Sequence, residues 1–257
     1  MKLAAPIVTV APFTIADDPL ALSAARIGAV RSAAADAGVA ITGLHWLLVK
    51  PDGLSITSPD AAVRARTIDA IRRIVDLCAA LGGRYLVHGS PAQRRTPPGV
   101  DRATARAWIA EALAAAAQAA QQAGVTYLLE PLPRDETDQV NTLDEAVALV
   151  REVGSPALAT MLDAKSAALS ETASAPDLLA RWLPEGVIRH VQLNDRNRRG
   201  PGQGSDRIAP IVAALLAGGY DGDIAIEPFE YVPDGAACAA RAAGYVRGLV
   251  EALSPSR

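Results

Sequence analysis

Four short segments of the chain end on side chains that can bind a metal ion. The segments are TYLLEP, TMLDA, HVQLND and IAIEPFE, and the candidate ligands are Glu130, Asp163, Gln192 and Glu227. These positions follow one another at intervals of 33, 29 and 35 residues, each about the length of one strand plus one helix. In a parallel barrel the carboxyl ends of such strands meet at one mouth. Oxygen ligands of this kind suit Mg²⁺ or Mn²⁺ better than a metal that prefers thiolates.

A single acidic residue after a strand is usually a helix cap or a solvated loop residue. Glu130 and Glu227 differ from that background because each ends an apolar run and each precedes a proline. They also share their repeat interval with two further oxygen donors. We therefore predict a shared metal site, and keep the helix-cap interpretation for any one carboxylate taken alone.

Alternating strands and helices must position these residues. Short apolar runs separated by helical patterns indicate a parallel sheet with crossover helices. The predicted strands are Ile7 to Pro12, Ile41 to Leu48, Arg84 to His88, Tyr127 to Glu130, Ala159 to Asp163, Ile188 to Leu193 and Ile224 to Glu227. The clearest helix signals are Thr67 to Ala80, Ala103 to Ala123, the capping pair Thr142 and Glu145, a helix after Ser205 and a last helix near Gly235.

This pattern predicts an α/β fold, a (β/α)8 TIM-type barrel formed as a single domain over residues 1–257. A closed barrel needs eight strands, and the sequence gives seven strand signals and opens directly on a strand. The first strand–helix unit is therefore expected to be lacking or altered. Such a chain should expose strand edges and apolar surface, which predicts pairing with a partner chain or a different N-terminal closure.

The composition favours a small-molecule enzyme of the cytoplasm. Lys plus Arg number 25 against 28 Asp plus Glu, and aromatic residues are 4%, so nothing predicts binding to nucleic acid. No run approaches the 18 to 20 apolar residues that cross a membrane, and Pro6 and Pro12 interrupt the first apolar stretch, so a signal peptide is not expected. Cys78 and Cys238 lie in helical patterns and are expected to be buried thiols in a reducing compartment.

Several motifs together resemble the xylose isomerase-like barrel superfamily, particularly the ketose 3-epimerases and their sugar phosphate isomerase/epimerase relatives. The resemblance covers about residues 40 to 230. It rests on Glu130-Pro131-Leu132 with Glu136 after it, Asn141-Thr142, Leu162-Asp163, His190-Val191-Gln192 leading to Asn197-Arg198 and Pro201-Gly202, and Glu227-Pro228.

The resemblance implies a set of roles for these residues. Divalent Mn²⁺ or Mg²⁺, with Co²⁺ as a further option, would be bound by Glu130, Asp163, Gln192 and Glu227. Glu136 and Arg198 would contact the sugar or sugar phosphate, and a homo-oligomer is expected because relatives often form dimers or tetramers.

Two positions depart from the epimerase pattern. Gln192 stands where epimerases usually have His, and Ser166 stands where they have a His three residues after the ligand Asp. Gln is the third ligand in hydroxypyruvate isomerase-like members, so the substrate stays open. His190, two residues before Gln192, points to the same side of its strand and would support that ligand; a buried His bonded to a backbone carbonyl is the alternative.

Residues after the second and third strands could line the substrate pocket. His45, Trp46 and His88 are candidates for its wall. Ser90 and Arg94 are expected to lie in a solvated basic loop, and a site for a sugar hydroxyl or a phosphate is the alternative.

The resulting functional hypothesis is metal-dependent proton transfer beside the carbonyl of a small ketose. Glu130 and Glu227 would be the catalytic pair, one removing the proton and the other returning it. Return to the same carbon gives epimerisation, which we favour, and return to the neighbouring carbon gives aldose–ketose isomerisation, as in a hydroxypyruvate isomerase. A non-catalytic sugar-binding barrel is the alternative of another class, whereas three His residues are too few for the three-metal nucleases of this fold.

Overall fold

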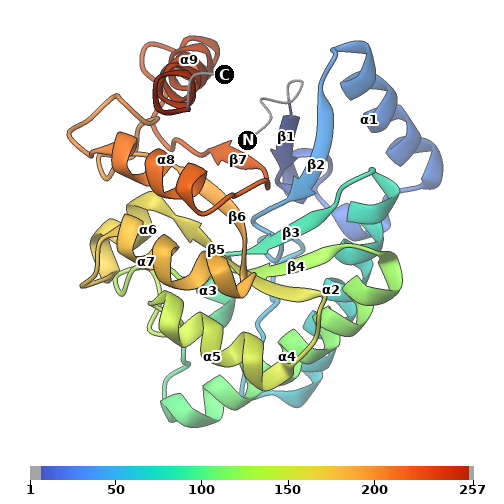
Figure 1. Cartoon of the computed structure of the whole chain (residues 1–257). Coiled ribbons are helices and arrows are strands. Elements are labelled where there is room, and N and C mark those ends of the chain that lie inside the picture. The colour runs from blue at the N-terminus through green and yellow to red at the C-terminus, as the bar shows by residue number, and fades with distance from the viewer. Residues whose placement is uncertain (1–6, 255–257) are drawn as a thin grey trace. The chain divides into compact units, whose positions relative to one another are not determined.

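Strands alternate with helices along the whole described part of the chain, as the sequence pattern predicts (Figure 1). The structure is a computed structural model that describes residues 7–254. These residues contain seven strands, and each overlaps one of the predicted segments. They divide into two compact units, the first ending at Ala159 and the second beginning at Thr160. The prediction of a single domain stays a prediction.

The first unit is a run of parallel strands in chain order covered by helices. Its strands are β1 (Ile7–Val10), β2 (Ala40–Leu44), β3 (Tyr85–His88) and β4 (Thr126–Leu129). Its helices are α1 (Ala24–Asp36), α2 (Ala61–Ala80), α3 (Pro91–Arg94), α4 (Arg102–Ala123) and α5 (Leu143–Val153), with short 3-10 turns at Pro12–Thr14 and Pro19–Ala21.

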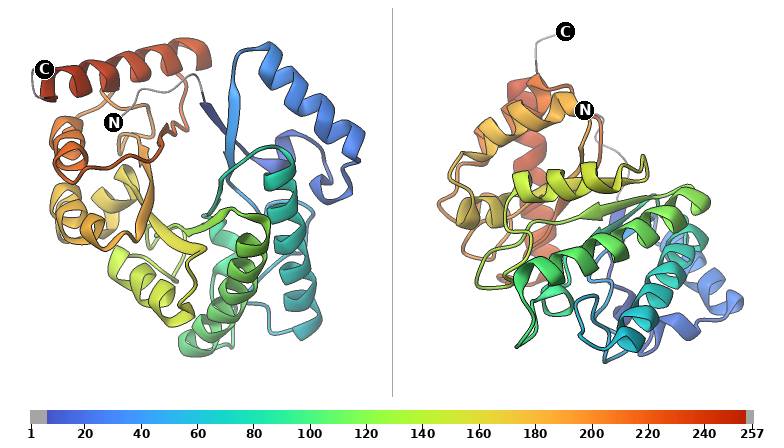
Figure 2. Two further views of the ribbon diagram at one scale, coloured as in Figure 1. Left: turned by 45° about the vertical axis from the view of Figure 1, so that its right-hand side comes forward. Right: turned by 90° about the horizontal axis from the view of Figure 1, so that it is seen from below.

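Helices α2 and α4 lie side by side against the strands of the first unit (Figure 2). Their inner faces are aliphatic: Ile71 and Val75 of α2 and Ile109 and Leu113 of α4 are buried together with Leu86 of β3. Burial of such side chains stabilises the fold by roughly 1.5–3 kcal/mol each. The core is therefore aliphatic, as the composition predicts.

Helix α2 begins six residues before the predicted start at Thr67. The side chain of Asp60 accepts a hydrogen bond from the backbone N–H of Ala62 and so caps the first turn. Because the first turn carries mostly exposed residues, apolar spacing alone does not reveal it. Helix α4 ends as predicted at Gly124, whose positive φ of 69° suits a residue without a side chain.

Strand β2 ends at Leu44, four residues before the predicted end at Leu48. The backbone turns there, and Trp46 adopts a positive φ of 53°. Leu47 and Leu48 remain buried outside the strand, and the N–H of Leu48 donates to the hydroxyl of Ser90 at 3.3 Å. The apolar run from Ile41 to Leu48 therefore predicted burial correctly, but it did not predict that the strand ends at Leu44.

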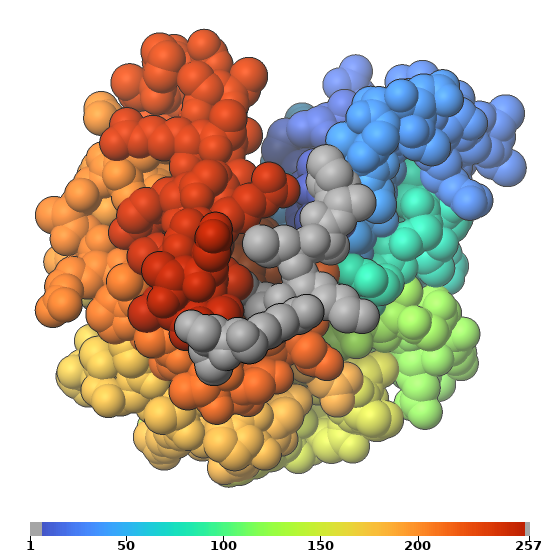
Figure 3. Space-filling model, turned by 45° about the horizontal axis from the view of Figure 1, so that its top comes forward, coloured from blue at the N-terminus to red at the C-terminus, as the bar shows by residue number. Residues whose placement is uncertain are grey.

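The second unit has the same plan. From Thr160 onward it contains the end of β5 (Leu158–Asp163), then β6 (Ile188–Leu193) and β7 (Ile224–Ile226), all parallel. Its helices are α6 (Ala164–Ser170), α7 (Ala175–Trp182), α8 (Ile208–Ala217) and α9 (Gly235–Leu253), with a 3-10 turn at Leu183–Glu185. Successive helices of this unit pack against one another, and α9 forms much of the red surface in Figure 3.

Strands β1 and β7 are the least buried of their units. None of the four residues of β1 is buried, Val8 is 38% exposed, and the three residues of β7 are half-buried. The expected exposed strand edges and pairing with a partner chain stay predictions. No helix within residues 7–254 combines the length and apolar character that crossing a membrane requires.

Candidate metal centre and its surroundings

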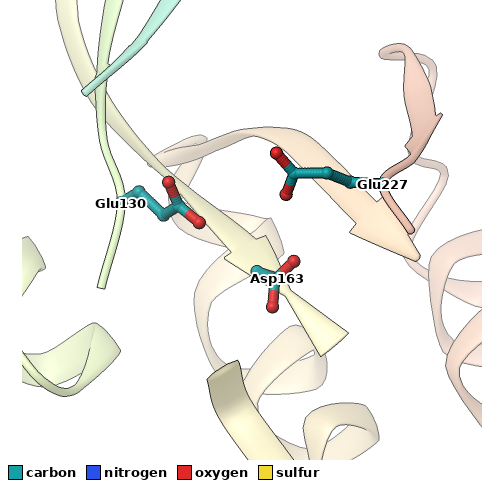
Figure 4. A group of neighbouring side chains, drawn as sticks. All are labelled: Glu130, Asp163 and Glu227. Atoms are coloured by element: carbon teal, nitrogen blue, oxygen red, sulfur yellow. The ribbon is translucent and has the colours of Figure 1, made fainter. Parts of the chain in front are cut away.

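Two carboxylates meet at the carboxyl ends of the strands in the second unit. Asp163 is the last residue of β5 and is 4% exposed, and Glu227 follows β7 and is half-buried. Their ligand oxygens lie within 4.8 Å of each other (Figure 4). Two carboxylates this close repel each other, so the arrangement favours a bound cation.

Gln192 supplies a further oxygen in the same unit. It is paired with Asp163 in the register of β5 and β6, and its side chain is 2% exposed. Its amide oxygen is buried and has no hydrogen-bond partner among the described residues. A buried carbonyl oxygen without a partner costs about 1–3 kcal/mol, and a metal ion would satisfy it. This unpaired oxygen and the two acidic neighbours fit a hard divalent cation.

Burial and the charge of Glu227 raise the pKa of Asp163 to about 6. The N–H of Ser166 and the amide of Asn194, at 2.7 Å each, donate to its two oxygens and oppose that rise. Ionised Asp163 is therefore costly without a cation, and a cation would remove the cost.

Asn194 connects the ends of all three strands of the second unit. Its side-chain amide donates to Asp163 Oδ2 at 2.7 Å and to the carbonyl of Glu227 at 3.3 Å. Its amide oxygen accepts the backbone N–H of Lys165 at 2.8 Å. One buried side chain thus fixes the orientation of the first carboxylate and the backbone of the second.

Two positively charged side chains lie near the aromatic ring of Phe229, two positions after Glu227. The Nζ of Lys165 lies 4.8 Å from the centroid of the Phe229 ring, and the guanidinium carbon of Arg198 lies 5.3 Å from it. Arg198 is exposed, and its carbonyl accepts the N–H groups of Phe229 and Glu230 at 2.8 and 2.9 Å. These backbone hydrogen bonds connect the segment after β6 to the segment after β7.

Glu130 occupies the corresponding place in the first unit. It follows β4, is 7% exposed, and its N–H donates to the carbonyl of His88 at 3.2 Å. Its carboxylate packs so closely over Gly89 that a Cβ at that position would overlap Oε2. A larger residue at Gly89 would therefore displace this carboxylate.

The expected environment of Arg94 was wrong. It was expected in a solvated loop, but it is fully buried at the end of α3, and Ser90 is buried as well. Its Nη1 donates to the carbonyl of His88 at 3.2 Å, while Nε and Nη2 have no hydrogen-bond partner among the described residues. Burial lowers the pKa of Arg94 to about 10, and the charges of Glu130 and Glu136 oppose that fall. It stays charged at neutral pH and is a fixed positive neighbour of Glu130.

His88 is also fully buried, and its Nδ1 lies 2.7 Å from the hydroxyl of Tyr127. Burial, followed by the charge of Arg94, lowers the pKa of His88 to about 3, so the imidazole is neutral at pH 7. His190 is fully buried in β6. The roles expected for His88 and His190 stay predictions.

The remaining expected substrate residues are all half-buried. His45 and Trp46 follow β2 and are half-buried, and Glu136 is half-buried after β4. The N–H of His45 donates to the carbonyl of Val10. Their contact with substrate stays a prediction. Cys78 and Cys238 are both buried, as expected.

Sequence reasoning missed three residues of these surroundings: Asn194, Lys165 and the buried state of Arg94. A signal existed for Asn194, because it follows Gln192 by two positions at the end of β6, where strand alternation places it on the side of that ligand. Alternation does not apply to Lys165, because this residue lies in helix α6. No local signal marks Arg94, because its burial depends on contacts made by the folded unit.

Comparisons with known proteins agree on one family. Residues 7–249 match the family model described as xylose isomerase-like TIM barrel. The chain is 32% identical to an L-ribulose 3-epimerase of Mesorhizobium japonicum over 79% of this chain and 66% of that protein. It is 31% identical to a D-psicose 3-epimerase of Agrobacterium fabrum over 80% of this chain and 70% of that protein.

A solved structure gives the same result for the fold. A crystal structure of a D-psicose 3-epimerase in the presence of D-fructose matches with a TM-score of 0.81 and 25% identity, covering 95% of this chain and 89% of that chain. The chain thus spans slightly less than two thirds of the first relative and most of this structure. The predicted TIM-type barrel fold and the predicted resemblance are both confirmed.

Proposed function

The chain belongs to the xylose isomerase-like TIM barrel family, and on that premise we propose that it is a divalent-metal-dependent ketose epimerase. Its reaction would invert the carbon beside the carbonyl of a small ketose. The observation that carries the proposal is the oxygen set of buried Asp163, buried Gln192 and half-buried Glu227 at the ends of three successive strands. Relatives named as L-ribulose and D-psicose 3-epimerases support the choice of epimerisation.

We assign Glu130 as the fourth ligand of this centre. Its place directly after β4 is similar to the place of Asp163 at the last position of β5, and its carboxylate lies directly over Gly89. Mg²⁺, Mn²⁺ or Co²⁺ all accept such an oxygen-rich set, and the absence of a His ligand favours the harder ions among them. The bound cation would supply the positive charge that stabilises the enolate oxygen.

Glu130 and Glu227 are the groups that we assign to proton transfer, one for each face of the reacting carbon. One carboxylate takes the proton from the carbon beside the carbonyl, and the carbon–hydrogen electron pair becomes part of the enolate double bond. The other carboxylate delivers a proton to the same carbon from the opposite face, which inverts its configuration. Glu136 and Arg198 would bind substrate hydroxyls, and His45, Trp46 and His88 would wall the pocket, with His190 supporting Gln192.

Aldose–ketose isomerisation is the second candidate. A protein of Streptomyces coelicolor provisionally named as a hydroxypyruvate isomerase is 28% identical over 83% of this chain, and Gln192 is the type of third ligand that this branch uses. Return of the proton to the neighbouring carbon distinguishes isomerisation from epimerisation. A small-molecule sugar as substrate, a cytoplasmic location and a homo-oligomer are parts of the same proposal.

Solvent exchange tests the proposal directly. Metal-free protein would receive Mg²⁺, Mn²⁺ or Co²⁺ in D₂O with D-psicose, D-fructose, L-ribulose or hydroxypyruvate, and NMR would locate the deuterium. We expect metal-dependent exchange at carbon 3 of a ketose, together with its epimer. Exchange at the carbon that interconverts aldehyde and ketone would select isomerisation instead.

Two variants separate the proposed roles from simple damage to the fold. Glu130→Gln and Glu227→Gln should each slow exchange by about 1,000-fold or more, because the general base and a ligand charge are lost together. Full turnover by either variant, folded and metal-loaded, would refute the assigned roles. If the wild type binds metal tightly but shows no exchange on any substrate of this panel, the result would favour a sugar-binding role over catalysis.

A further inference from the structure

Lys165 is an unusual residue for this chain. Of the 25 basic residues, three are lysines, namely Lys2, Lys50 and Lys165, and the others are arginines. Lys165 is 7% exposed and lies two positions after Asp163. A lysine offers a compact ammonium with three donors, whereas arginine offers a planar fork. General surface charge in this chain is supplied by arginine, so a buried lysine at this place calls for a specific explanation.

The second unit holds Lys165 in a fixed position. Its backbone N–H donates to Asn194 Oδ1 at 2.8 Å, and the same Asn194 orients Asp163. Its Nζ lies 4.8 Å from the centroid of Phe229, two positions after Glu227. The side chain of Lys165 therefore starts two positions after Asp163 and reaches the ring of Phe229, two positions after Glu227.

The side chains near the Lys165 ammonium differ in exposure. Lys165 itself is 7% exposed, Glu227 and Phe229 are half-buried, and Arg198 is exposed. Burial of an ammonium costs free energy, which the face of the Phe229 ring offsets in part by about 0.5–2 kcal/mol. In such a partly desolvated place a hydrogen bond from the ammonium to a negative oxygen is much stronger than in water.

We propose that Lys165 is a catalytic residue whose ammonium donates a hydrogen bond to the substrate oxygen that becomes negative during the reaction. The inference rests on the proposed epimerase function. When a glutamate takes the proton from the carbon beside the carbonyl, the carbon–hydrogen electron pair forms the new carbon–carbon double bond. The carbonyl π pair moves to oxygen, and Lys165 stabilises that oxygen without transferring its own proton.

This role differs from that of Arg198, which shares the Phe229 ring. Arg198 is exposed and belongs to the segment after β6, so its loss should weaken substrate binding and raise KM. Lys165 would interact more strongly with the transition state than with the ground-state substrate. Its loss should therefore lower kcat and change KM little.

The test compares three single variants in the full-length, metal-loaded protein. Lys165→Gln removes the charge and keeps donor capacity, Lys165→Arg keeps the charge, and Lys50→Gln is the control. Lys50 is a partly exposed lysine paired with Asp52 at 3.0 Å. Each variant would be characterised by thermal unfolding, by Mn²⁺ titration calorimetry, and by kcat and KM on the ketose that the wild type epimerises.

We expect Lys165→Gln to lose about 100-fold or more in kcat with KM within about fivefold and Mn²⁺ affinity within about threefold of wild type. Lys165→Arg should recover part of kcat, and Lys50→Gln should match wild type. Retained kcat in folded Lys165→Gln would overturn the inference while leaving the epimerase function intact. An increase in KM confined to phosphorylated ketoses would also overturn it, in favour of an anion-binding role. Absence of exchange in the wild type itself would refute the epimerase function and the inference together.

Discussion

The carboxylates at the strand ends of the two units meet very different electrostatic surroundings. In the first unit, Glu130 has the buried positive charge of Arg94 for a neighbour and neutral His88 beside it. In the second unit, Asp163 and Glu227 face each other within 4.8 Å, and the pKa of Asp163 rises to about 6. In the first unit, the positive charge of Arg94 compensates the negative charge of Glu130. In the second unit the two carboxylates raise the cost of ionising Asp163, and a cation would lower it, so the second unit should contribute most of the metal affinity.

Asp163→Asn is expected to give the largest effect. It removes a ligand charge, so Mn²⁺ affinity should fall by at least about 100-fold. The pKa of Asp163 in the folded protein lies above its unfolded value, so its ionised form destabilises the metal-free protein at pH 7. The metal-free variant should therefore unfold at a higher temperature than wild type. Calorimetric titration and scanning calorimetry measure the two changes.

Asp69→Asn on the exposed side of α2 is the matched control for this variant. It changes the same side chain in the same way away from the centre, so both measurements should stay at wild-type values. Unchanged Mn²⁺ affinity in Asp163→Asn would show that the second unit does not dominate metal binding, and the contrast between the units would fail.

Gly89→Ala disturbs the first surroundings without changing any charge. The added methyl group would overlap the carboxylate of Glu130, which must then move. We expect Mn²⁺ affinity to fall about 10-fold, less than for Asp163→Asn, because the ligand set is displaced rather than depleted. Gly28→Ala in α1 is the control, since no heavy atom lies within 4 Å of its new methyl group. Equal affinity of Gly89→Ala and wild type would argue against Glu130 as a ligand.

A pH series should give an effect no larger than that of Gly89→Ala. Below pH 6 a proton competes with the cation for Asp163, because the pKa of this group is raised to about 6 in the metal-free protein. Mn²⁺ affinity should fall about 10-fold between pH 7 and pH 5. The fall should be flatter in Asp163→Asn. An equally steep fall in that variant would assign the competing proton to another group.

The strand ends that carry the ligands could be predicted from the sequence. Apolar runs ending on Glu130, Asp163 and Glu227 locate β4, β5 and β7 to within one residue, because buried parallel strands read as continuous apolar segments. Helix α1 has no buried residue, so it lacks the apolar stripe that would set its bounds. The end of β2 was also predicted wrongly, because burial continues through Leu47 and Leu48 after the strand ends.

The surroundings of the ligands were harder to predict than the ligands themselves. Arg94 follows a turn and carries a charge, which locally indicates a solvated loop, yet the folded unit buries it completely. Its neighbours Glu130 and Glu136 stand 36 and 42 positions further along the chain. Such long-range compensation of charge leaves no local pattern, and only the folded arrangement reveals it.

Asn194 sets a practical limit on redesigning the substrate range of this protein. Its single amide joins the side chain of Asp163, the backbone of Lys165 and the carbonyl of Glu227. Mutant libraries that vary the exposed Arg196 and Asn197 leave these three hydrogen bonds in place, because neither side chain takes part in them. A library that also varies Asn194 would remove hydrogen bonds at three strand ends at once, so we expect most of its members to be inactive.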